Sequence, residues 1–143
     1  MLHDAVEDPA ALTPAELREA YEIELRAAVE AAGIEAAAAA ADVDEGTVRA
    51  LLDGKASDLT LERAAALLAI REDAPDAEAV AAEVRDHLLM GMVTGVVDVD
   101  TVAANVDLDL SGTEIRQGLE GRMPLTLAQL AAIHRYVAGR NDR

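Results

Sequence analysis

The side chains that could support catalysis or bind a metal are few and widely spaced along this chain. There is no cysteine, so a disulfide, a thiolate metal site and a cysteine nucleophile are all excluded. The three histidines, His3, His87 and His134, are far apart in sequence, and none has a metal-ligand partner at helical spacing. We also find no glycine-rich phosphate loop and no paired nucleophile and base. The sequence therefore predicts no enzyme, no metal site and no cofactor.

One acidic segment is similar to the start of a calcium-binding EF-hand loop. It contains Asp107, Asp109 and Ser111 at alternate positions. The similarity ends further on, because position twelve of that loop is a glutamate and here it is Gly118. Helix capping explains acids in this region better than calcium binding does.

A short pattern organises the chain, and it first occurs at residues 42–55. Asp44 can cap a helix on which Val48 and Leu51 share one apolar face. Gly54 then follows as a residue that can adopt the left-handed conformation past a helix C-terminus. This stretch predicts a tight turn, a short helix and a glycine stop.

The same pattern occurs again 67 positions further on, at residues 109–122. After each copy comes the sequence Leu-Thr-Leu, at 59–61 and at 125–127. Before each copy lies a longer stretch with apolar residues at every fourth position, 17–29 and 80–92. This order indicates a duplicated unit, in which the second copy carries about four additional residues before its turn.

We therefore expect an all-α fold made of two tandem four-helix units packed as one compact body. The first unit covers residues 13–70 and the second covers 76–138, with the proline-containing connector 71–75 between them. Residues 1–12 are acidic and irregular, so we expect a flexible N-terminus. Residues 139–143 are expected to form a loose tail.

The composition is strongly acidic, with a net charge of -16, and Lys55 is the only lysine among twelve basic residues. Such an acidic, lysine-poor, alanine-rich chain is typical of salt-accumulating halophiles, although a GC-rich genome gives a similar bias. The N-terminus lacks the basic and apolar regions of a signal peptide. The longest uncharged apolar run, residues 88–97, is about half of the roughly 20 residues that span a bilayer. We expect a cytoplasmic protein without membrane contact.

The repeated stretch resembles the helix-turn-helix of the Cro/C1-type repressors, a pattern that LacI-type headpieces share. The first copy carries it with Val43, Thr47, Val48, Leu52, Gly54 and Lys55, and the second with Leu110, Ile115, Leu119, Gly121 and Arg122. Two degenerate copies in a small acidic chain are also similar to an uncharacterised protein family of halophilic archaea. The repressor resemblance implies that the second helix of each motif enters the DNA major groove. The chain departs from the repressor pattern at Asp42 and Asp109, where the turn often has glycine.

The resemblance places different side chains at the base-reading positions of the two motifs. In the first motif the helix starts with acidic residues, which repel phosphates, so we expect weaker DNA binding there through Thr47, Arg49 and Lys55. In the second motif the side chains suit base edges or phosphates. The favoured DNA-binding residues are therefore Ser111, Thr113, Arg116, Gln117 and Arg122.

The distribution of charge favours the second motif as well. Residues 110–143 contain five arginines and three acids, a net charge of +2, so the other 109 residues carry -18. The sequence thus predicts a DNA-binding transcriptional regulator of a halophile, with double-stranded DNA as its partner. The alternative is a helical interaction or adaptor module that keeps the fold without binding DNA and associates with a second copy or another protein.

Overall fold

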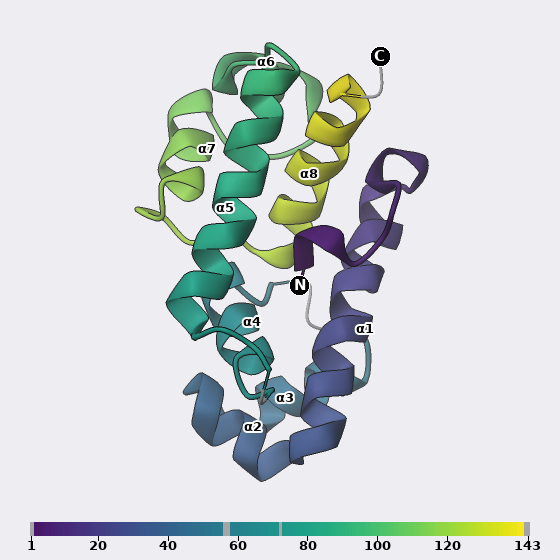
Figure 1. The fold of residues 1–143 in the computed structure, drawn as a ribbon, viewed down its shortest axis with the longest axis vertical. Helices are drawn as coiled ribbons and strands as arrows, with labels where there is room; N and C mark the ends of the chain where they lie inside the picture. Colours follow the sequence, from purple (N-terminus) through teal and green to yellow (C-terminus); the bar gives the residue numbers. More distant parts are fainter. Residues whose placement is uncertain (1, 56–57, 72, 142–143) are drawn as a thin grey trace.

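A computed structural model describes residues 2–55, 58–71 and 73–141. In this part of the chain every secondary-structure element is a helix. Two short 3₁₀ helices, η1 (Leu2–Asp4) and η2 (Pro9–Ala11), come first. The first unit then contains α1 (Pro14–Ala32), α2 (Ile34–Ala41), α3 (Glu45–Leu52) and α4 (Leu61–Leu68). The second unit contains α5 (Ala77–Thr94), α6 (Val99–Asn105), α7 (Gly112–Leu119) and α8 (Leu127–Asn141). The predicted all-α class is confirmed (Figure 1).

Side-chain caps determine where the helices begin. Thr13 and Glu16 form a capping box at the start of α1, in which each side chain bonds the other residue's backbone N–H. The Asp44 carboxylate accepts a backbone N–H at the start of α3 at 2.8 Å. Thr60 and Thr126 accept in the same way at α4 and α8. Threonine, aspartate and glutamate are the residue types that local sequence favours at such positions.

Glycines end α3 and α7 in the same manner. Gly54 has a φ of 75° and Gly121 a φ of 79°, a region that other residues enter only at a cost. The next backbone N–H then turns back to the helix, from Lys55 at 2.7 Å and from Arg122 at 2.8 Å. The repeat is thus visible in individual hydrogen bonds.

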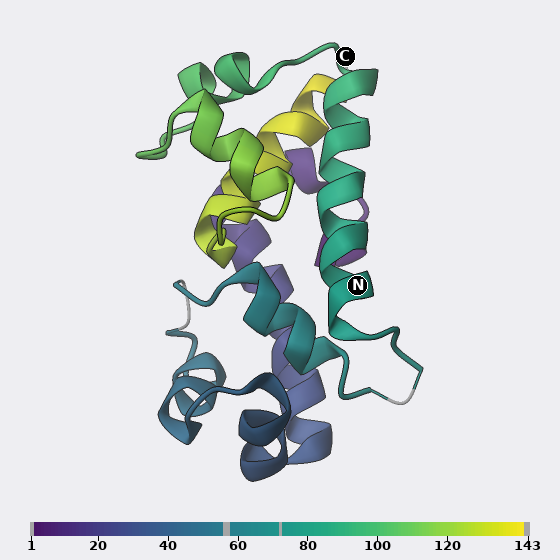
Figure 2. The ribbon, with the colours of Figure 1, turned by 90° about the vertical axis from the view of Figure 1, so that its left-hand side faces the viewer.

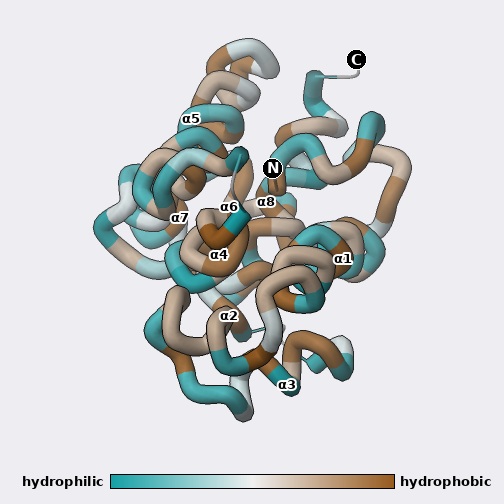
Figure 3. Tube along the Cα trace, turned by 60° about the horizontal axis from the view of Figure 1, so that its bottom comes forward, coloured by the Kyte–Doolittle hydropathy of each residue, from teal (hydrophilic) through white to brown (hydrophobic). Residues whose placement is uncertain are grey.

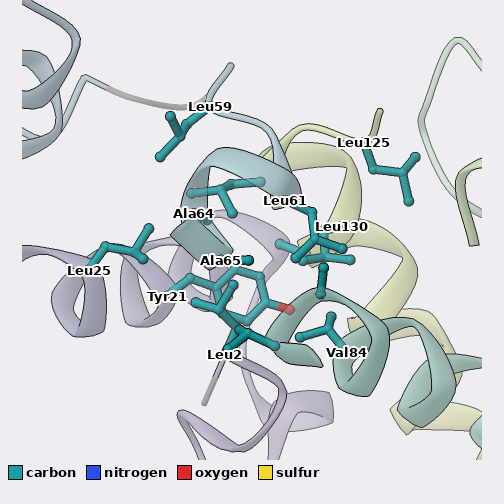
Figure 4. Close-up of a cluster of buried hydrophobic side chains, with 14 of the residues drawn as sticks. Leu2, Tyr21, Leu25, Leu59, Leu61, Ala64, Ala65, Val84, Leu125 and Leu130 are labelled. Carbon is teal, nitrogen blue, oxygen red and sulfur yellow. The ribbon is translucent and has the colours of Figure 1, made fainter. Parts of the chain in front are cut away.

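The two units are interlocked rather than stacked end to end. The long helix of each unit packs against the last helix of the other, α1 against α8 and α5 against α4, as well as against the last helix of its own unit. One buried cluster runs through both units, and Figure 4 shows Tyr21 of α1 among side chains such as Leu61, Val84 and Leu130. Most helices carry both hydrophobic and hydrophilic residues (Figure 3), whereas α2 is almost entirely alanine, with Glu35 as its one charged residue.

A reciprocal backbone contact marks the centre of the molecule. Leu61 donates its N–H to the carbonyl of Leu125 at 2.8 Å, and Leu127 donates to the carbonyl of Leu59, also at 2.8 Å. Each hydrogen bond is the counterpart of the other, with the donor and acceptor units interchanged. An approximate two-fold axis therefore passes between the facing residues Thr60 and Thr126. The repeat therefore corresponds to internal pseudo-symmetry.

Both ends of the chain differ from what the sequence led us to expect. The N-terminal segment is packed from residue 2 onward, because Leu2 is fully buried and the Leu12 carbonyl accepts from Arg135 at 3.1 Å. At the other end, α8 continues to Asn141, whose side-chain amide donates to the Gly91 carbonyl at 3.0 Å. The remaining residues of the expected tail, 142 and 143, lie outside the described residues.

The additional residues of the second unit are divided between two connections. One residue separates α1 from α2, whereas residues 95–98 separate α5 from α6. The turn between α2 and α3 is residues 42–44, whereas that between α6 and α7 is residues 106–111.

No single helix in the described residues is long and apolar enough to cross a membrane. Helices α5 and α6 reach that length and composition only together, and they are bent by 94° at the break between them.

Candidate nucleic-acid interface

The second motif consists of α6, the turn at residues 106–111 and α7. A capping box between Ser111 and Glu114 fixes the first turn of α7, with hydrogen bonds of 3.0 and 3.1 Å. Gly112 lies so close to Asp100 of α6 that a Cβ there would overlap its carboxylate. Ile115 and Leu119 are buried, and they anchor the inner face of α7. These contacts determine which side chains of α7 face solvent.

The structure leaves all five favoured residues of the second motif exposed: Ser111, Thr113, Arg116, Gln117 and Arg122. Arg116 and Gln117 are neighbours on the outer face of α7, opposite its buried residues, as the sequence predicts. Arg122 follows the left-handed Gly121 at the end of the helix. Ser111 uses one lone pair of its hydroxyl oxygen to cap α7, so its O–H and its second lone pair remain for a ligand.

The arginines of this surface are not neutralised by the protein. Among the described residues, neither Arg116 nor Arg122 has a carboxylate oxygen within 4.0 Å. Hydrogen bonds from the backbone and hydroxyl of Thr101 lower the pKa of Asp98, and the positive charge of Arg116 lowers it further. Arg116 is therefore near one carboxylate but is free to bind an external group.

The first motif has the shorter turn but a less suitable surface. Asp42 occupies the turn with a φ of 55° and a ψ of 46°, the left-handed conformation that aspartate tolerates better than most residues other than glycine. The Thr47 hydroxyl donates to Asp44 at 2.8 Å, and Arg49 pairs with Glu45 at 3.5 Å. Two of the three candidate residues are thus engaged by acids, and Lys55 is the exposed remainder.

The ionised carboxylate of Asp44 makes the first motif less suitable for DNA than the second. The backbone and hydroxyl hydrogen bonds from Thr47 lower the pKa of Asp44, so its negative charge persists below the usual range of a carboxylic acid. That charge lies at the N-terminal end of α3, which the resemblance would place closest to the bases.

The two motifs lie on one side of the molecule. In Figure 2, α7 is at the upper left and α3 at the lower left, while α5 runs down the right-hand side. The contact between Thr60 and Thr126 lies between the motifs, so the pseudo-two-fold axis relates them.

The structure also brings together the three histidines, which sequence reasoning left as unrelated. The His87 ring centroid lies 4.8 Å from that of His3 and 5.6 Å from that of His134. The Tyr21 hydroxyl lies 2.5 Å from Nδ1 of His134. In the described residues, no group of three or more His, Cys, Asp or Glu side chains is arranged to hold a metal ion. The available signal was the helical spacing that places His134 on the same face as Leu130 and Val137.

The fold therefore defines an all-α protein with two four-helix units related by an internal pseudo-two-fold axis. The chain belongs to the family described as "Family of unknown function (DUF5791)", whose model matches residues 17–140. The matched range includes both motifs and the contact between the units. Comparisons with curated proteins and with solved structures find no match.

Proposed function

We propose that this protein is a transcriptional regulator that binds double-stranded DNA and reads bases with α7. The observation that carries the proposal is the pair Arg116 and Gln117, exposed together on a helix whose other face is anchored by Ile115 and Leu119. A guanidinium can donate two hydrogen bonds to guanine, and a glutamine amide can both donate to and accept from adenine. Neighbouring side chains of these two types suit adjacent base edges in the major groove.

The surroundings of α7 supply groups for the DNA backbone. Thr113 is exposed in the first turn of α7, so its hydroxyl can donate to a phosphate. Arg122 lies beyond the other end of the helix and is exposed. Contacts of this kind position a protein on phosphates, and the base contacts then give specificity.

The net charge of -16 would oppose DNA binding in dilute buffer. We expect the protein to work at high salt, where the Debye length is roughly 3 Å or less and distant carboxylates are screened. Counterion release then contributes little to affinity. Binding would depend on short-range hydrogen bonds and apolar contacts, which the exposed face of α7 can provide.

Selection of genomic DNA fragments by the full chain in multimolar KCl tests this proposal. We expect one enriched sequence, which the double variant Arg116→Ala, Gln117→Ala no longer selects while its melting temperature stays unchanged. Each bidentate base contact contributes about 1–3 kcal/mol, so the loss should be clear. Arg49→Ala is the matched control from the first motif and should change selection little, because Arg49 is already paired with Glu45. Selection without enrichment would contradict the proposal.

A second candidate function, a protein interaction module, has one observation in its favour. Met90, Val93 and Val96 have exposed fractions of 67%, 75% and 85%, and they are close together in sequence at the end of α5. Exposed apolar groups of this kind mark contact surfaces. If this function holds, Val93→Glu should abolish self-association or partner binding measured by light scattering, and DNA selection should yield no enriched sequence.

A further inference from the structure

The C-terminal half of α5 exposes a cluster of apolar side chains within an uncharged stretch. Residues 88–97 carry no charge, in a chain of which 28% of the residues are charged. Met90, Val93 and Val96 lie in this stretch, and they are three of the four large hydrophobic residues that are exposed in the described part of the chain. Each lies three positions after the last, a spacing that makes side chains neighbours on a helix surface. Such a cluster marks a contact surface, whereas a single exposed residue, here Ile23 on α1, is ordinary.

A cavity of about 420 Å³ adjoins this cluster, between the C-terminal halves of α5 and α8. Met90 and Thr94 line it from α5, and Val137 and Ala138 line it from α8. Among the described residues, its wall contains no aspartate, glutamate, lysine or arginine. Four other cavities in this part of the chain each have more acids than bases in their walls. The three exposed residues and this cavity together form an uncharged region, which we call the α5–α8 surface.

The charge of the chain favours a second copy as the partner of this surface. Two copies, each with a net charge of -16, repel each other wherever their acids meet. The α5–α8 surface lies between the nearest acids along this part of the chain, Asp86 and Asp98, so the repulsion is weakest there. Arg140 lies beside it, because a Cβ on Gly95 would be 3.3 Å from the Cβ of Arg140. Among the described residues Arg140 has no carboxylate oxygen within 4.0 Å, so its positive charge is available to an acidic partner.

The shape of the surface suits contact between two identical patches. In a two-fold interface every contact occurs twice, because both copies use the same residues. Val93 is 75% exposed, and Met90, which precedes it by one turn, is in the wall of the cavity. An apolar protrusion and an uncharged cavity are thus side by side. Two-fold symmetry can place the protrusion of each copy in the cavity of the other, and the flexible side chain of Met90 can adapt to it.

Val96 is an unfavourable residue for the isolated chain. Its side chain is 85% exposed, and its φ of 53° is strained for a β-branched residue. A glycine would adopt this backbone conformation easily and would expose no apolar side chain. Burial of Val96 against a second copy would offset both costs.

We propose that the α5–α8 surface is the interface of a two-fold homodimer, in which Val93 of each copy enters the cavity of the other. This proposal names the partner for the second candidate function, the interaction module, and it does not depend on base reading by α7. Helix α5 lies on the opposite side of the molecule from α3 and α7 in Figure 2, so the dimer leaves both motifs uncovered.

Sedimentation equilibrium of the full chain tests whether the dimer forms. In multimolar KCl, the average mass should rise with protein concentration from that of one chain to that of two. The dissociation constant should be at least tenfold lower in multimolar KCl than at the lowest salt at which the chain stays folded, because ions screen the repulsion between copies. A chain that is monomeric at every concentration up to millimolar would overturn the proposal. Association that weakens as salt is added would also overturn it.

Charged substitutions test where the copies meet. Val93→Glu should weaken the dimer at least tenfold without lowering the melting temperature of the monomer. Ile23→Glu, the matched control, adds the same charge at another exposed apolar residue and should leave the dimer unchanged. The Arg116→Ala, Gln117→Ala variant should dimerise like the parent, so loss of DNA reading and loss of the dimer can be told apart. A dimer that Val93→Glu leaves intact would contradict the proposed interface.

A mixing experiment tests the two-fold contact itself. Ala138→Arg, in the cavity wall, should weaken the homodimer as Val93→Glu does. Mixed together, the two variants should form a heterodimer at least tenfold tighter than either homodimer. The glutamate of one copy then meets the arginine of the other, while the second contact of the pair keeps its native residues. No recovery on mixing would overturn the insertion of Val93 into the partner's cavity.

Discussion

Gly118 lies directly against Leu125. A Cβ built on Gly118 would be 2.6 Å from Cγ of Leu125, well inside the contact distance of two carbon atoms. The first motif has Leu51 at the equivalent position, so the two motifs pack their second helices differently.

We expect Gly118→Ala to lower the free energy of unfolding by about 1–3 kcal/mol, the usual cost of overpacking a core. Gly46→Ala is the control, because a Cβ at Gly46 meets its nearest atom at an ordinary 3.4 Å. That change should be neutral or stabilising, since alanine favours a helix over glycine by up to about 1 kcal/mol. Urea unfolding in concentrated KCl measures both. A Gly118→Ala variant as stable as the parent would show that Leu125 moves freely.

Val96 has a φ of 53°, which is strained for a β-branched residue. It occupies the position after the end of α5 where α3 and α7 have glycine. We expect Val96→Gly to raise the free energy of unfolding by about 1 kcal/mol, because it removes strain of about 1–3 kcal/mol and adds the chain entropy of a glycine. Val93→Gly, within the last turn of α5, should lower stability instead. Thermal unfolding of both variants checks the pair.

The histidine cluster should make the fold less stable in acid. Burial, with the nearby His87 and His3, lowers the pKa of His134 from 6.5 to about 4, so the unfolded chain binds this proton more readily than the folded chain does. Its contribution is intact above pH 6.5 and is lost as the pH falls toward 4, at most about 3 kcal/mol at 1.36 kcal/mol per pKa unit. Burial also lowers the pKa of His3, which acts in the same direction, although Asp4 and Glu83 oppose that shift.

Melting temperatures between pH 7.5 and 4.5 test this expectation. The variant His134→Gln keeps an acceptor for Tyr21 but cannot be protonated, so its melting temperature should fall less steeply below pH 6.5. Parallel curves for the two proteins would rule out His134 as the acid-sensitive group.

The melting temperature should also depend strongly on salt. A net charge of -16 on 143 residues produces self-repulsion that added ions screen. We expect a substantial rise between low salt and multimolar KCl. A flat profile would count against adaptation to a saline cytoplasm.

The local features of the fold could be predicted because each depends on a few adjacent residues. The Thr13 and Glu16 capping box, the Asp44 cap and the glycine at 54 are all determined within one turn of helix. The exposure of Arg116 and Gln117 followed from the spacing of Ile115 and Leu119.

The relationships between distant segments could not be predicted in this way. Periodicity shows that α1 has an apolar face, but it does not show whether α4 or α8 covers that face. The histidine cluster joins η1, α5 and α8, so no local spacing contains it. The burial of Leu2 was hidden because a single leucine in an acidic segment has no periodic pattern.

The interlocked packing of the two units has a consequence for how such a chain could arise. If one unit existed alone, the surface of its long helix that now packs on the other unit would be uncovered, and two copies could close the same contacts as a two-fold homodimer. The connector between α4 and α5 converts that association into an intramolecular one, so assembly no longer depends on protein concentration. In a single chain the outer surfaces of α3 and α7 can differ, because a substitution in one does not change the other.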